Sequence, residues 1–147
     1  FASNSKRHQQ LLDEGCLEVM IRILNSSDSF NNMFSALFFS ILCENSSLHG
    51  ILSIPEVIQP LFHLIAMTDS AAVETVRYSV LALANLASSG ESHPFILSEI
   101  EIQMNSFFNL ASNPDVEIQR YFGLLLSNLA ENVNSHNLLS TPIALSK

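Results

Sequence analysis

One short phrase occurs four times along this chain at a nearly constant spacing. It begins at His8, His49, His93 and His136, which lie 41, 44 and 43 residues apart, and each histidine is followed by leucine or isoleucine and then by a short polar residue. A period of this size is typical of proteins built from stacked repeats, because one such unit is too small to bury its own apolar face. We therefore expect the function to lie in an extended surface rather than in a catalytic pocket.

A second phrase follows the same period. Residues 81–87 read LALANLA and residues 124–130 read LLLSNLA, 43 residues apart. Two different phrases thus share one repeat length. The predicted repeats cover residues 4–46, 47–89 and 91–132, all approximate, with a partial fourth repeat at 134–147.

The apolar residues within each repeat recur at steps of three and four, which predicts helices with one buried face. No segment alternates at period two for long enough to compete as a strand, so the predicted class is all-α. The expected helices are 17–24 and 30–43 in the first repeat, 48–53, a helix opened by Pro55, and 72–87 in the second, and 99–111 and 116–131 in the third. The expected breaks are Gly15, 53–55, 68–70 and 113–115.

The charge balance limits the partners. Fourteen acidic residues stand against six basic ones, for a formal net charge of −8. Nucleic-acid binding needs clustered Lys and Arg, so this composition argues against it and favours a neutral or basic protein partner. The longest apolar stretches are shorter than the roughly 18 residues of a membrane span.

Three helices per unit of about 42 residues, with a Leu-x-Asn-Leu-Ala phrase closing the long helix, resemble the armadillo repeat. The matching residues are Gly15 at the first turn, VEIQR at 116–120, the ANLA and SNLA phrases that end at Ala87 and Ala130, and ENVNSH at 131–136. The resemblance spans the whole chain. It implies a right-handed α-α superhelix, an armadillo-repeat solenoid with about three full repeats and partial ends. HEAT repeats, with two helices per unit, are the alternative.

Armadillo proteins are mostly scaffolds and adaptors, in which the third helices line a concave groove that holds extended peptides. This chain is similar to the vacuole-associated and other adaptor-type members. It departs from the nuclear import receptors, which carry Trp four residues before the groove Asn, where Leu81 and Leu124 stand here. The chain contains no Trp at all, which argues against classical recognition of nuclear localisation signals.

Two matching sets of residues on the long helices form the candidate site. Residues four apart share a helix face, and by the resemblance this face lines the groove. The sets are Arg77, Leu81 and Asn85, and Arg120, Leu124 and Asn128, and the first repeat carries Met33, Leu37 and Ile41 instead. An Asn amide can pair with any peptide backbone, and Arg suits carboxylates. The alternative is structural: the Asn residues would bond neighbouring backbone, and the Arg residues would pair with nearby acids.

Catalysis and metal binding have little support. The sequence has no Gly-rich phosphate loop, no GxSxG and no HExxH, so we expect no enzyme and no cofactor. The four recurring histidines stand one repeat apart, too far to converge on one ion, and we expect them to cap or bridge repeats. Cys16 and Cys43 form no CxxC and are expected to be small apolar residues rather than a disulfide or a metal site.

These features predict a non-enzymatic, cytoplasmic adaptor that binds a peptide or protein segment along its concave face. The alternative is a structural or membrane-trafficking scaffold that acts by self-association, or by lipid anchoring through segments outside this sequence. A third class, a ubiquitin ligase or other enzyme with armadillo repeats, would need a further module elsewhere.

The chain starts at Phe1 without an initiator Met and stops inside a repeat, so we interpret it as a piece of a longer array with exposed apolar ends that favour end-to-end association. The exposed residues are expected to include some of Leu11, Leu12 and Phe30 at the first end, and some of Leu138, Leu139 and Ile143 at the last. Between repeats, the residues expected to be buried are Leu42, Leu83, Leu86, Leu126 and Leu129.

Overall fold

The computed structural model describes residue 10 and residues 15–131, and in this part of the chain every regular element is helical. No strand occurs among these residues, so the predicted all-α class is confirmed there. The α-helices are α2 (Cys16–Leu24), α3 (Ser29–Leu42), α4 (His49–Leu52), α5 (Pro55–Ile65), α6 (Val73–Leu86), α7 (His93–Ile102), α8 (Met104–Phe108) and α9 (Val116–Leu129). Four 3-10 turns connect them: η1 (Ser46–Leu48), η2 (Ser70–Ala72), η3 (Gly90–Ser92) and η4 (Asn109–Ser112).

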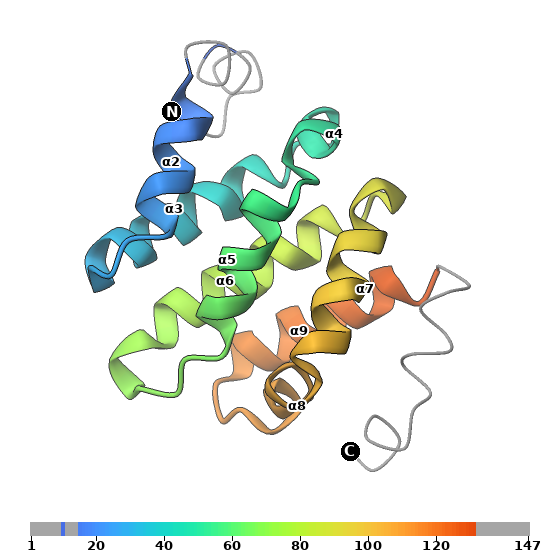
Figure 1. Ribbon diagram of the computed structural model, residues 1–147. Coiled ribbons are helices and arrows are strands. Elements are labelled where there is room, and N and C mark those ends of the chain that lie inside the picture. Colours follow the sequence, from blue (N-terminus) through green and yellow to red (C-terminus); the bar gives the residue numbers. More distant parts are fainter. Residues whose placement is uncertain (1–9, 11–14, 132–147) are drawn as a thin grey trace.

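Three long helices form one layer of the molecule. Helices α3, α6 and α9 have 14 residues each, and their first residues lie 44 and 43 positions apart. Helix α6 packs between α3 and α9, so the three lie side by side in chain order (Figure 1). The shorter helices α2, α5, α7 and α8 pack on one another and form a second layer. Helices one period apart in the sequence are therefore neighbours in space.

The core lies between these two layers. Phe107 of α8 contacts Phe62 of α5 and Phe122 of α9, which joins the layers through aromatic rings. Four of the five leucines predicted to be buried between repeats are fully buried, which confirms them: Leu42, Leu83, Leu86 and Leu129. These side chains belong to the hydrophobic core.

Leu126 is the exception, because it is only partly buried. Its counterpart 43 residues earlier, Leu83, is fully buried. Helix α6 has a described long helix on each side, whereas α9 has one on one side only. The neighbouring Leu125 is the fully buried residue at this point of α9.

The predicted breaks are confirmed. Gly15 has φ 79°, a left-handed conformation that glycine adopts without strain, and α2 begins at the next residue. The aspartates within the breaks at 68–70 and 113–115 cap the elements that follow: Asp69 accepts from the Ala71 amide, and Asp115 accepts from the Ile118 amide. Asp28 caps α3 in the same way, through the Asn31 amide.

The predicted middle helix at 99–111 is wrong in its bounds. Helix α7 runs from His93 to Ile102, Gln103 breaks it with φ −118° and ψ 39°, and α8 then follows. The equivalent of Glu99 in the preceding repeat is Pro55, and a proline holds the residue before it out of the helical region. Ile54 accordingly has φ −132° and ψ 151°. Because Glu99 imposes no such restriction, the helix continues through it.

Among the described residues no single helix is both long and apolar enough to cross a membrane. The segments Ser46–Leu52 and Pro55–Ile65 pass on length and composition only when taken together, and they meet at a bend of 95°.

Candidate functional site

One face of the long helices stays uncovered, and we call it the long-helix face. From residue 74 to the end of α6, only five side chains escape burial, and they recur at helical steps on one side. Equivalent positions on α3 and α9 are likewise exposed or half-buried. The face comprises Phe30, Met33, Phe34, Leu37 and Ile41 of α3, Glu74, Arg77, Tyr78, Leu81 and Asn85 of α6, and Glu117, Arg120, Tyr121, Leu124 and Asn128 of α9.

All six residues predicted for the site lie on this face. Because α6 packs directly against α9, the two sets of three stand on adjacent helices. Leu124 is 43% exposed and Leu81 is half-buried. The face of α3 is apolar, with Met33, Leu37 and Ile41 at the equivalent positions. The face therefore changes from apolar on α3 to polar on α6 and α9.

The two asparagines bond the backbone of the preceding long helix. The Asn85 side-chain amide donates to the carbonyl of Ser40 at 3.2 Å, and that of Asn128 donates to the carbonyl of Ala84 at 2.8 Å. Each carbonyl belongs to the last turn of its helix, where no amide further along the helix can reach it. The neighbouring carbonyls of that turn are bonded by local backbone amides, for example Phe39 by Cys43 and Leu83 by Ala87. Each Asn thus satisfies a carbonyl in the last turn of the preceding long helix that has no backbone partner among the described residues.

The predicted structural role, in which each Asn bonds neighbouring backbone, therefore accounts for the side-chain nitrogen but not for the side-chain oxygen. The amide nitrogens of Asn85 and Asn128 are engaged, whereas their side-chain oxygens accept no hydrogen bond from the described residues. Those oxygens belong to half-buried residues of the long-helix face. They are free to accept a hydrogen bond from a ligand.

The two arginines behave differently from each other. Arg77 reaches from α6 to Asp115 at the start of α9, with its Nη2 2.7 Å from the carboxylate Oδ2. The hydrogen bond from Arg77 holds the pKa of Asp115 below its ordinary value, and the same bond raises the pKa of Arg77. Asp115 also caps α9 through its other oxygen. This ion pair links α6 to the start of α9.

Arg120 pairs within its own helix, with Nη1 2.9 Å from the Glu117 carboxylate. Both side chains are well exposed, so water screens the pair and it adds little to stability. The pKa of Tyr121 is raised, first by partial burial and then by a hydrogen bond to Glu117. Arg120, Glu117 and Tyr121 therefore form one polar group at the α9 end of the face.

An aromatic series on the same face was missed from the sequence. Phe34, Tyr78 and Tyr121 lie 44 and 43 residues apart, at equivalent positions of α3, α6 and α9. Phe34 is 57% exposed, and the two tyrosines are half-buried. The signal was present in the sequence, because an aromatic residue recurs with the period of the two phrases.

The recurring histidines that the structure describes cap helices. Nε2 of His49 donates to the Cys43 carbonyl at 2.6 Å, and that of His93 donates to the Ala87 carbonyl at 2.7 Å. Nδ1 of His49 also bonds the hydroxyl of Ser89, which lies 40 residues further along the chain, between α6 and η3. Both imidazoles are buried. His8 and His136 lie outside the described residues.

Neither cysteine makes a disulfide. Burial raises the pKa of the Cys43 thiol to about 12, so it stays protonated and unreactive at neutral pH. Cys16 is half-buried. Within residues 15–131, no three His, Cys, Asp or Glu side chains come close enough together to hold a metal ion.

Of the residues predicted at the exposed chain ends, only Phe30 lies in the described part; it is 67% exposed, and it belongs to the long-helix face, which is exposed in each of the three described repeats. Leu11, Leu12, Leu138, Leu139 and Ile143 lie outside the described residues, as does the partial repeat at 134–147.

Comparison of the chain with protein-family models, with curated proteins and with solved structures found no match.

Proposed function

We propose that this chain is part of an armadillo-type solenoid and acts as a non-enzymatic adaptor that binds an extended protein segment on the long-helix face. One observation carries the proposal: α3, α6 and α9 each leave the same positions uncovered, and the three helices are neighbours. A continuous surface that repeats with the period of the fold suits a ligand that is itself repetitive, and an extended backbone is such a ligand.

The chemistry of the face supports this class of ligand. The free side-chain oxygens of Asn85 and Asn128 would accept main-chain N–H groups, whatever the ligand's side chains are. Their nitrogens are held by the preceding helix, so the oxygens are already oriented before the ligand arrives. Such preorganisation reduces the entropy lost on binding.

The spacing of the helices sets the length of the ligand. Packed helices lie ~8–10 Å apart, so α3 and α9 are separated by roughly 16–20 Å across the face. An extended chain rises ~3.3 Å per residue, so about six residues cover this distance. The side chains that would contact these six ligand residues are the aromatic residues Phe34, Tyr78 and Tyr121. Leu81 and Leu124, which lie between the tyrosines and the asparagines, would contact them too.

The charge of the described residues favours a basic ligand. They contain twelve acidic side chains and three arginines, and two of those arginines are paired with acids. A net negative charge on the protein as a whole speeds the approach of a positively charged segment.

A scaffold that works by self-association remains the second candidate, and a specific observation favours it. Phe30 and Phe34 are 67% and 57% exposed one helical turn apart on α3. Sedimentation velocity over a range of concentrations tests this candidate. Association that Phe30→Ser and Phe34→Ser together abolish would support the scaffold, whereas a monomer at all concentrations would exclude it.

The adaptor proposal is tested with a 12-residue peptide selected from a random phage-displayed library against this chain. Leu81→Glu and Leu124→Glu together should weaken its binding at least tenfold, because they place charge in the middle of the face. Ile102→Glu is the matched control, because Ile102 is an apolar residue, 72% exposed, on α7 in the other layer. Equal affinities for the double variant and the control would overturn the proposal.

A further inference from the structure

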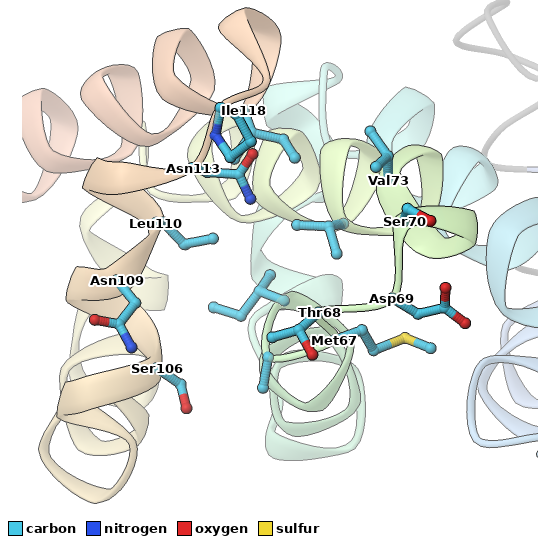
Figure 2. A pocket seen from close by; sticks show the side chains of 14 residues that line it. Met67, Thr68, Asp69, Ser70, Val73, Ser106, Asn109, Leu110, Asn113 and Ile118 are labelled. Atoms are coloured by element: carbon cyan, nitrogen blue, oxygen red, sulfur yellow. The ribbon is translucent and has the colours of Figure 1, made fainter.

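A cavity of about 400 Å³ lies between the second and third repeats (Figure 2), and none of its lining residues belongs to the long-helix face. One wall is the segment that joins α5 to α6, and the other is α8 with η4 and the start of α9. Leu110 reaches into the space from η4, while Val73 of α6 and Ile118 of α9 stand on the other sides (Figure 2). This volume is that of a small ligand or of one large side chain with its backbone.

The lining excludes several classes of ligand. Its inner part is carbon, from Ile65, Val73, Val76, Leu110 and Ile118. Asp69 is the one charged residue among the fourteen that line the cavity, so no cation is present to hold a phosphate or a carboxylate. Much of the polar rim is already engaged, since Asn113 accepts from the Asp115 amide and Asp69 accepts from the Ala71 amide. Recognition of a polar metabolite is therefore poorly supported, whereas an apolar group fits.

Asp69 stands at the edge of the cavity, on the side away from Leu110, and its carboxylate is turned outward (Figure 2). One of its oxygens caps η2, and the other accepts no hydrogen bond from the described residues. The described part of the chain as a whole is acidic, with twelve acids and three arginines in residues 15–131. A positive charge next to an apolar anchor would complement this edge.

We propose that the cavity is a second docking site, which takes a leucine-sized aliphatic side chain of a partner protein while a lysine or arginine beside it in the partner's sequence pairs with Asp69. The anchor supplies buried apolar contact, and the cation selects for a basic segment. The site does not depend on the long-helix face, because its lining shares no residue with that face.

The test uses two short probes, N-acetyl-leucyl-lysine amide and N-acetyl-leucyl-glutamate amide, titrated into the methyl-labelled chain at low salt. The methyl resonances of Val73, Val76, Leu110 and Ile118 report occupancy. We expect the lysine probe to shift them with a dissociation constant of about 1 mM or tighter, and the glutamate probe to bind at least threefold more weakly.

Three variants identify the residues responsible. Asp69→Asn keeps the cap on Ala71, because Asn also caps, but removes the charge, and it should weaken the lysine probe about threefold or more. Asp28→Asn is the matched control, since Asp28 caps α3 through the Asn31 amide and does not line the cavity. Ala66→Phe fills the cavity from an exposed lining position and should weaken both probes at least tenfold.

Ser106→Phe fills the cavity from the opposite wall and serves as a second block if Ala66→Phe perturbs the fold. The proposal is overturned if neither probe shifts the four methyl groups at 10 mM, if the two probes bind equally well, or if both filled variants bind the lysine probe as the wild type does. Leu81 and Leu124 do not line the cavity, so replacing them should not change these titrations. Either proposal can therefore fail while the other stands.

Discussion

The side-chain amide of Asn85 supplies the hydrogen bond that the carbonyl of Ser40 lacks at the end of α3, at 3.2 Å. Asn128 does the same for Ala84 at the end of α6, at 2.8 Å. The recurring Asn therefore links α6 to α3 and α9 to α6. This relationship explains why the phrase that contains it repeats with the period of the helices.

Removing this amide should destabilise the protein. Asn85→Ala leaves the Ser40 carbonyl without its partner, and we expect the free energy of unfolding to fall by about 1–2 kcal/mol. Urea unfolding followed by circular dichroism measures the change. Asn105→Ala, at an exposed position of α8, is the control and should change stability by less than about 0.5 kcal/mol. Equal losses for the two variants would show that the bond to Ser40 contributes nothing.

The buried leucines between the two layers should contribute much more to the free energy of unfolding than the Asn85 hydrogen bond does. Leu86 and Leu129 are fully buried, so truncating either one to Ala should lower the free energy of unfolding by about 2–5 kcal/mol. Leu124→Ala is the control, because Leu124 is 43% exposed on the long-helix face, and its cost should be below about 1 kcal/mol. A loss below about 1 kcal/mol at Leu86 or Leu129 would mean that the faces of the long helices are assigned incorrectly.

His49 should also matter for stability. His49→Ala empties a buried position and leaves the Cys43 carbonyl and the Ser89 hydroxyl without this partner, so we expect a loss of about 2–4 kcal/mol. His63→Ala compares an exposed histidine on α5 and should be close to neutral. Chemical unfolding of both variants at pH 7.5 checks the difference. Similar midpoints would contradict the capping role.

The Arg77–Asp115 pair should make stability depend on pH. Because the pKa of Asp115 is lowered in the folded state from an ordinary value of 3.8, the pair's contribution is complete above that value. It is lost as the pH falls through the lowered folded-state pKa. Asp115→Asn keeps the cap but removes the charge, so its urea midpoint should lie below that of the wild type at pH 6 and approach it near pH 2. Arg77→Met should show the same trend. A gap that persists undiminished at pH 2 would contradict this linkage.

Much of the helical arrangement could be predicted from the sequence, because the period of the His and Asn phrases is also the spacing of the long helices. The bounds of α7 were predicted incorrectly, because this helix was placed by analogy with the preceding repeat, and the two repeats differ at one position. Pro55 starts a new helix, whereas Glu99 at the equivalent place lets α7 continue.

The candidate site was predictable in part. Spacing alone placed the six residues from Arg77 to Asn128 on one face, but it could not show which atoms are engaged. The pairing of Asn85 with Ser40 joins residues 45 apart, and that of Arg77 with Asp115 joins residues 38 apart. The cavity lined by Val76 and Leu110 was not predictable either, since it arises where two separate segments meet.

The most direct test of the adaptor proposal is to map where a bound peptide contacts the protein. Backbone and side-chain NMR shifts would be recorded during titration of the library-selected 12-residue peptide. The proposal predicts the largest changes on the long-helix face, at Phe34, Tyr78 and Tyr121 together, with Leu81 and Leu124 between them. Changes centred instead on α2, α5 and α7, with the long-helix face unaffected, would contradict it.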